Sequence, residues 1–135
     1  MSVIGNKLAL DTNAAVRLLN GEGGFKELIV QVDAIFLPLP VIGELRYGAL
    51  GSVRRRENFD RIARLIESCV VLPIDLGTVT HYAEIRHRLR TMGSPIPGND
   101  VWIAALCLQY GLPLITDDRH FDSIDGLRSV KHGEW

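Results

Sequence analysis

Short apolar runs alternate along the chain with longer segments whose apolar residues recur at helical spacing. The runs predict strands at residues 7–10, 34–38, 70–74 and 112–116, and a short fifth strand within 127–132. The spacing between them predicts helices at residues 14–19, 25–33, 41–50, 54–69, 77–92 and 100–110. In the segment 54–69, for example, Phe59, Ile62 and Ile66 fall on one helical face. Strands alternating with helices predict an α/β domain with a mainly parallel sheet.

Length and composition add few constraints to this pattern. The 135 residues contain no internal repeat, low-complexity tract or linker, so we expect a single domain over residues 1–135. The net charge of −1 gives no general reason to expect a nucleic-acid or membrane partner. We find no apolar run of membrane-spanning length and no leader-like N-terminus, and Cys69 and Cys107 lie in apolar surroundings that suggest buried, reduced thiols. These features predict a cytoplasmic protein with no membrane partner.

Five acidic residues fall at equivalent places in the predicted elements. Asp11 directly follows the first strand, Glu44 lies one turn into the helix after the second strand, and Asp100 opens the apolar helix 100–110. Asp117 and Asp118 directly follow the fourth strand. Strand C-terminal ends and helix N-terminal turns meet at the same edge of a parallel α/β sheet. For any one acid, stabilisation of a helix N-terminus, about 0.3–1 kcal/mol, is a sufficient explanation.

Together, the acids are better explained by a bound cation. Two unit charges about 4 Å apart repel by roughly 4 kcal/mol at an effective dielectric near 20, and four clustered carboxylates contain several such pairs. Such a cluster either takes up protons or holds a divalent cation. Oxygen ligands without a partnering Cys or His favour Mg²⁺ or Mn²⁺ over zinc. A carboxylate-bound Mg²⁺ commonly completes its shell with water and substrate phosphate oxygens, which is the arrangement used in phosphodiester hydrolysis.

Other catalytic motifs have little support. The sequence contains no Gly-x-Ser-x-Gly elbow, no His-Glu-x-x-His motif and no phosphate-binding loop ending in Gly-Lys-Ser/Thr. The four histidines show no metal-ligand spacing. His120 is close enough to the acids to support them, but we interpret it as a surface residue.

Two alternative interpretations belong to other functional classes. A phospho-acceptor receiver domain needs an acidic pair after its first strand and a Lys after its last strand. Here one acid follows the first strand, and no Lys occurs between Lys26 and Lys131. The second alternative is a binding module that holds RNA or a protein partner without cutting, and the full set of acids argues against it.

Three stretches carry a family resemblance: "LALDTNAAVRLL", "PLPVIGELRYGAL" and "GNDVWIAALCLQYGLPLITDDRHFDSIDGL". Together they resemble the PIN-domain ribonucleases, specifically the VapC-type toxins of type II toxin–antitoxin pairs. The resemblance covers nearly the whole chain, and the block from Asp100 onward is its most specific part. It implies a three-layer α/β/α PIN-like fold. It also implies a metal-dependent endoribonuclease that uses Mg²⁺ or Mn²⁺ to hydrolyse RNA.

The resemblance assigns roles to individual positions. Asp11, Asp100 and Asp118 match the metal-binding acids, and Glu44 matches a helical Glu that binds metal or positions the attacking water. These four are the predicted catalytic residues. Asp118 is preferred to Asp117 because the family acid lies two residues after the strand-four Thr. The predicted supporting residues are Thr12, Asn13, Thr116 and Asp117.

The resemblance also implies partners: an RNA substrate, a second copy of the chain in a homodimer, and a VapB-type antitoxin that blocks the acidic pocket. Arg46 and Arg86 are candidates for RNA contact, as are the Arg run 54–56 and the neighbouring Arg88 and Arg90. Ordinary solvated helix charge explains each of these arginines equally well. The RNA target, the number of metal ions and the dimer surface are not readable from the sequence.

Overall fold

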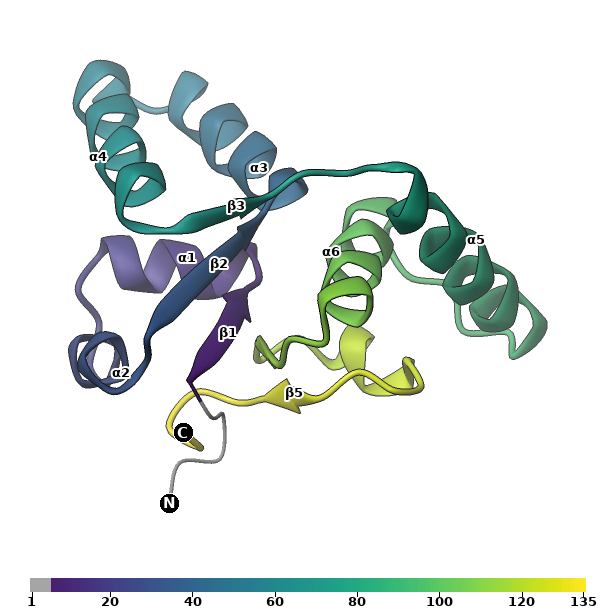
Figure 1. The fold of residues 1–135 in the computed structure, drawn as a ribbon. Helices are drawn as coiled ribbons and strands as arrows, with labels where there is room; N and C mark the ends of the chain where they lie inside the picture. The colour runs from purple at the N-terminus through teal and green to yellow at the C-terminus, as the bar shows by residue number, and fades with distance from the viewer. Residues whose placement is uncertain (1–5) are drawn as a thin grey trace.

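A computed structural model describes residues 6–135 and contains one five-stranded sheet (Figure 1). The strand order is β3-β2-β1-β4-β5, and each neighbouring pair is parallel. The strands are β1 (Lys7–Leu10), β2 (Ala34–Pro38), β3 (Val70–Leu72), β4 (Leu114–Ile115) and β5 (Ser129–Val130). The prediction of an α/β fold with a parallel sheet is therefore confirmed.

Within residues 6–135, six α-helices cover the sheet. They are α1 (Thr12–Leu19), α2 (Phe25–Gln31), α3 (Leu39–Leu50), α4 (Arg55–Ser68), α5 (Leu76–Thr91) and α6 (Gly98–Tyr110). Helices α1 to α4 lie on one side of the sheet and α5 and α6 on the other (Figure 1). This arrangement gives the three layers that the family resemblance implied. Within the described residues, no helix is long and apolar enough to cross a membrane.

The hydrophobic core explains why the central elements are continuous apolar runs in the sequence. Leu8, Ala9 and Leu10 of β1 are all fully buried. Consecutive strand residues point to opposite faces, so burial of all three requires helices on both sides of the sheet. Helix α6 is buried on most of its circumference, from Val101 through Cys107. The apolar helix after Asp100 is thus a core element that carries its acid to the sheet edge.

The order of connections places a crevice above β1 and β4. From β1 the chain adds β2 and then β3 on one side, and after α5 and α6 it returns to add β4 and β5 on the other side. In open parallel sheets, the point where the order reverses leaves a crevice at the carboxyl ends of the two strands. Asp11 directly follows β1 and Thr116 directly follows β4, so both residues lie at this crevice.

Several element boundaries differ from the predicted ones for local reasons. Helix α1 begins at Thr12 rather than residue 14, because the Asp11 side chain caps it by accepting a hydrogen bond from the Ala14 N–H. Strand β3 ends at Leu72, directly before Pro73, which has no N–H to donate. A 3₁₀ helix, Arg119–Ser123, was not predicted. It is too short for apolar periodicity and is held by the fully buried Phe121.

Candidate metal centre

Four of the predicted acids line one pocket at the carboxyl edge of the sheet. The pocket has a volume of about 550 Å³ and is lined by Asp11, Glu44, Asp100 and Asp118, together with Thr12, Asn13, residues 97–99 and His120. Its walls come from the residues that follow β1 and β4, from the first turns of α1 and α6, and from the second turn of α3. The pocket therefore brings together side chains that lie up to 109 residues apart in the sequence, Asp11 and His120.

Asp11 is the most deeply placed of these acids, with 4% of its surface exposed. Its Oδ1 accepts a hydrogen bond from the Ala14 N–H at 2.8 Å, and its Oδ2 accepts one from the Thr116 hydroxyl. Burial raises the pKa of Asp11 and outweighs the two hydrogen bonds, which lower it. The charges of Asp100 and Asp118 raise the pKa further. Asp11 is thus a rigidly held carboxylate whose negative charge is unfavourable in the metal-free fold.

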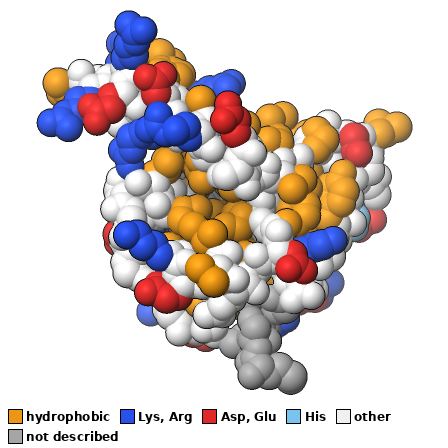
Figure 2. Space-filling model, turned by 60° about the vertical axis from the view of Figure 1, so that its left-hand side comes forward, with side chains coloured by type: hydrophobic (Ala, Val, Ile, Leu, Met, Phe, Trp, Pro, Cys, Tyr) orange, Lys and Arg blue, Asp and Glu red, His pale blue; other side chains and the backbone are white. Residues whose placement is uncertain are grey.

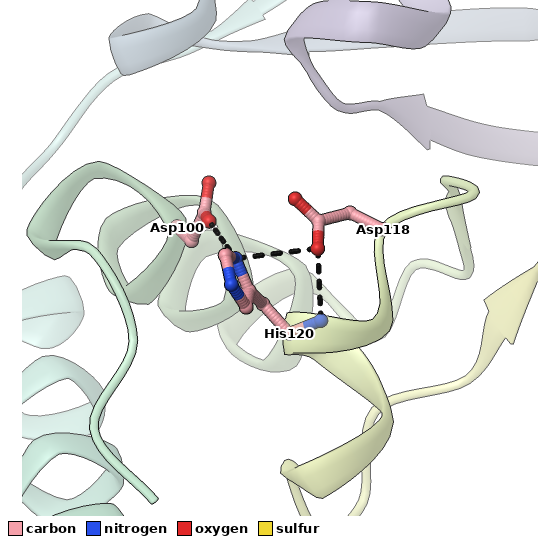
Figure 3. A group of neighbouring side chains, drawn as sticks. All are labelled: Asp100, Asp118 and His120. Carbon is pink, nitrogen blue, oxygen red and sulfur yellow. Dashed lines mark hydrogen bonds and ion pairs between the residues drawn. The ribbon is translucent and has the colours of Figure 1, made fainter.

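Asp100 and Asp118 face each other across the imidazole of His120 (Figure 3). The His120 Nδ1 lies 3.1 Å from Asp100 Oδ2 and 3.2 Å from Asp118 Oδ1. One ligand atom from each of these three residues lies within 4.8 Å of the others. Burial also raises the pKa of Asp100, partly opposed by the hydrogen bond from His120, while the charges of Asp118 and Glu44 raise it. The three side chains form a compact set of candidate cation ligands.

Two threonines fix the orientation of the acids. The Thr116 hydroxyl donates to Asp11 and accepts from the Asp118 N–H at 3.0 Å, so one buried side chain links the ends of β1 and β4. Thr12 Oγ1 donates to Glu44 Oε1 at 2.8 Å, which ties α3 to α1. Asn13 lies in the pocket wall next to Thr12. These contacts place Thr12, Asn13 and Thr116 where supporting residues were predicted, although their roles remain predictions.

Asp117 points away from the acidic pocket. Its Oδ2 accepts from Arg17 Nη1 at 2.7 Å, and its Oδ1 accepts from the His132 backbone N–H at 2.8 Å. Asp117 therefore lines a neighbouring cavity, and Asp118 alone of the pair faces Asp100. The two adjacent carboxylates have different partners, and this favours Asp118 as the candidate ligand.

The predicted RNA-contacting arginines do not line the acidic pocket. Arg46 is exposed on α3, and Arg86 lies over the ring of Tyr82, whose hydroxyl accepts a hydrogen bond from it. Arg88 pairs with Asp125, and Arg54 pairs with Glu57 at 3.8 Å. Any contact of these side chains with RNA would be outside the pocket.

His120 is exposed, as the sequence predicted, but its ring also contacts Asp100 and Asp118, which the sequence did not establish. Asp118 caps the 3₁₀ helix by accepting from the His120 N–H at 2.9 Å, and this turn directs the imidazole toward Asp100. The signal in the sequence was the two-residue spacing from Asp118, which is typical of an Asx-type cap. The cap can be recognised only once the short 3₁₀ helix is known, and apolar periodicity does not reveal so short a helix.

The donor set fits a hard divalent cation. Among residues 6–135, no Lys or Arg lines the acidic pocket, and His120 is its single side chain able to carry positive charge. Four carboxylates with at most one imidazolium leave an excess of negative charge at a partly buried site. Carboxylate oxygens suit Mg²⁺ and Mn²⁺, and an imidazole nitrogen is more typical of transition metals such as Mn²⁺ than of Mg²⁺.

The acid after β3 does not belong to this pocket. Asp75 instead caps α5, and this argues against the phospho-acceptor site of a receiver domain.

The fold and this pocket define a class of protein: a three-layer α/β domain with a cluster of carboxylates, a candidate cation site, at the switch point of a parallel sheet. The chain matches the PIN domain over residues 8–127, and it belongs to that family. It is 31% identical over 124 residues to ribonuclease VapC5 of Mycobacterium tuberculosis, covering 90% of each chain. It is also 31% identical to ribonuclease VapC1 of Haemophilus influenzae, covering 88% of this chain and 92% of the relative.

Solved structures show the same similarity. DNA-bound VapBC from Salmonella typhimurium aligns with a TM-score of 0.87 and 27% identity, covering 93% of this chain and 98% of the other. VapBC-1 from nontypeable Haemophilus influenzae aligns with a TM-score of 0.85 and 29% identity, covering 93% and 97%. The family resemblance expected from the sequence is confirmed.

Removing one charge from the pocket should stabilise the metal-free protein at neutral pH. The pKa of Asp100 is raised on folding, so its favourable contribution is present below the unfolded pKa and is lost as pH rises through the folded pKa. In EDTA at pH 7, Asp100→Asn should therefore raise Tm by roughly 3 °C, which corresponds to about 1 kcal/mol at this chain length. Asp60→Asn, on the exposed face of α4, is the matched control and should leave Tm unchanged. A Tm for Asp100→Asn at or below that of the control would contradict the electrostatic account.

Proposed function

We propose that this chain is a metal-dependent endoribonuclease that acts as the toxin of a type II toxin–antitoxin pair. It would hydrolyse RNA phosphodiester bonds with Mg²⁺ or Mn²⁺. The observation that carries the proposal is the convergence of Asp11, Glu44, Asp100 and Asp118 in one pocket whose walls contain no Lys or Arg within residues 6–135. Membership of the PIN-domain family and the printed names of the relatives, VapC ribonucleases, support it.

The proposed roles follow from the contacts. Asp11, Asp100 and Asp118 would hold the cation, with the His120 ring as a further donor. A bound divalent cation neutralises phosphate charge and lowers the pKa of an attacking water. Glu44 would hold the cation or position that water. Thr12 occupies its Oε1 and so leaves Oε2 free to accept a hydrogen bond.

The first test is RNA cleavage by protein purified free of antitoxin. We expect cutting with Mg²⁺ or Mn²⁺ and none after addition of EDTA. Asp11→Asn and Asp100→Asn should each lose more than about 100-fold in rate, since even residues that only support a metal ligand account for about 10–100-fold. The exposed Asp60→Asn should cut at the wild-type rate. Cleavage that persists in EDTA, or in either pocket variant, would overturn the proposal. A pure binding module would instead bind RNA without cutting it under any condition.

The second prediction separates the two adjacent acids. Asp118→Asn removes a carboxylate that faces Asp100, whereas Asp117→Asn changes a side chain bound to Arg17 and His132. In the same assay, Asp118→Asn should lower the cleavage rate at least about tenfold more than Asp117→Asn does. Equal losses, or a greater loss for Asp117→Asn, would show that Asp117 has the role that we assign to Asp118.

An apolar groove beside the acidic pocket supports the antitoxin part of the proposal. A cavity of about 250 Å³ between α1, α3 and α4 shares Thr12 and Glu44 with the acidic pocket and is lined further out by Val16, Leu19, Leu45, Gly48 and Ile62. Figure 2 turns the α1, α2 and α4 side toward the viewer and shows hydrophobic side chains gathered across the middle of this face. The solved relatives are VapBC complexes. We propose that a segment of a VapB-type antitoxin lies in this groove and so covers the pocket.

A glycine on α3 allows the groove to be blocked without disturbing the core. A Cβ added at Gly48 meets no atom within 4 Å, and Gly48 lines the groove. Gly48→Trp should therefore fold and cut RNA, but its inhibition by the antitoxin should weaken by at least about tenfold, because a steric clash at the centre of an interface removes well-packed contacts. Gly23→Trp is the control, since Gly23 is an exposed glycine in the turn before α2 whose added Cβ also meets no atom within 4 Å, and it lies outside both the groove and the exposed α3 face. Equal inhibition of both variants would place the antitoxin elsewhere.

The homodimer, the cytoplasmic location, the single domain over residues 1–135 and RNA contact by Arg46 and Arg86 also remain proposals. Exposed apolar side chains support the homodimer: Leu39, Tyr47 and Leu50 on α3 and Val53 in the turn after it. Tyr47 and Val53 are 81% and 103% exposed, which is unusual for large apolar residues on a monomer. Light scattering on the purified chain measures the assembly directly.

A further inference from the structure

A second cavity adjoins the acidic pocket on the side of β4 away from Asp100. It has a volume of about 390 Å³ and lies between α1, the α1–α2 turn, the end of β4 and the C-terminal segment. It shares two walls, Asn13 and Asp118, with the acidic pocket. An RNA strand with one phosphate in the acidic pocket would thus place an adjoining nucleotide within reach of this cavity.

The cavity combines apolar surface with a polar rim. Ala14, Val16, Phe25 and Ile115 supply the apolar part, and Arg17, Glu22, Asp117 and His132 supply the polar part. RNA bases splayed from a single strand are recognised by this combination, with flat contact for the ring and hydrogen bonds for its edge. The volume is also within the range of small-ligand pockets.

The polar rim is held in place by contacts between distant segments. Arg17 Nη1 donates to Asp117 Oδ2 at 2.7 Å and lies 2.7 Å from His132 Nδ1. His132 stacks on Trp135 with an interplanar angle of 9°, and both rings pack against Phe25. Gly24 has a φ of +91°, and a Cβ there would lie 3.2 Å from Trp135 Cζ2, so both the backbone conformation and this close packing favour glycine. The rim is therefore a preorganised wall.

Two groups on this rim remain available to a ligand. Arg17 has five N–H donors, and within the part of the chain that the structure describes its Nη2 makes no hydrogen bond. Glu22 is half-exposed, and its contact with Arg17 Nε is long, at 4.0 Å. An available guanidinium donor thus lies beside an available carboxylate acceptor.

We propose that this cavity is a base-recognition subsite that prefers guanine in the nucleotide next to the scissile phosphate. Guanine presents two neighbouring N–H donors, N1 and N2, to a carboxylate, and O6 as an acceptor for an arginine. Glu22 accepts from the two N–H groups and Arg17 donates to O6, which is a contact that arginine commonly makes to guanine. The inference rests on the proposed function for its substrate class, RNA, and extends that function to sequence preference.

Binding, rather than cutting, tests this subsite. The protein is Asp100→Asn, which we expect to bind RNA without cleaving it, and the probes are labelled five-nucleotide RNAs of uridine with G, A, C or U at the centre. Fluorescence anisotropy should show roughly fivefold tighter binding of the G probe, the low end for a bidentate base contact. Adding Glu22→Gln, which replaces one acceptor oxygen by a donor, should reduce that preference to less than about twofold.

Glu27→Gln provides the matched control, because Glu27 is exposed on the neighbouring α2 and does not line the cavity. It should leave the guanine preference intact. Equal binding of all four probes, or a guanine preference that survives Glu22→Gln, would overturn the subsite. Failure of the wild-type protein to cut RNA with metal would overturn the proposed function instead, so the two outcomes are distinguishable.

Discussion

Repulsion between carboxylates at the carboxyl edge of β1 and β4 is the constraint on which the rest of the site depends. Burial and neighbouring charge raise the pKa of both Asp11 and Asp100, so the metal-free pocket opposes the charged state of its own side chains. The pocket is held together by packing and by neutral donors: Thr116 on Asp11 and Thr12 on Glu44. The repulsion lowers the free energy of unfolding, and a bound cation would relieve it, so the cluster is suited to bind a cation.

The scaffold makes this convergence possible because its most rigid elements carry the acids. Asp11 follows a strand that is buried on both faces, and Asp100 lies in the first turn of the most buried helix. Asp118 is positioned through Thr116, which links it to Asp11, and through the cap of the short 3₁₀ helix. Movement of any one element would therefore change the spacing of the carboxylates, and preorganised spacing is what a metal-ligand set requires.

The sequence predicted what depends on periodicity and on position along the chain. The alternation of elements predicted the parallel α/β sheet, and the placement of Asp11, Glu44 and Asp100 at strand and helix ends predicted that they would meet. The opposite directions of Asp117 and Asp118 were harder to predict, because they depend on Arg17 and on a C-terminal segment that pairs with β4. The position of His120 depends on a five-residue turn, and the cavity beside Asp118 on ring packing around Gly24. Such contacts join distant segments and leave no periodic signal.

The central claim is that these carboxylates form one cation site, and anomalous diffraction from crystals soaked in Mn²⁺ tests it most directly. The account predicts an anomalous peak at bonding distance, about 2.0–2.6 Å, from oxygens of Asp100 and Asp118, within the pocket that Asp11 and Glu44 also line. The peak should be absent from crystals of Asp100→Asn treated in the same way. A wild-type pocket without a peak, or a Mn²⁺ ion bound by Asp117 on the far side of β4, would contradict the account.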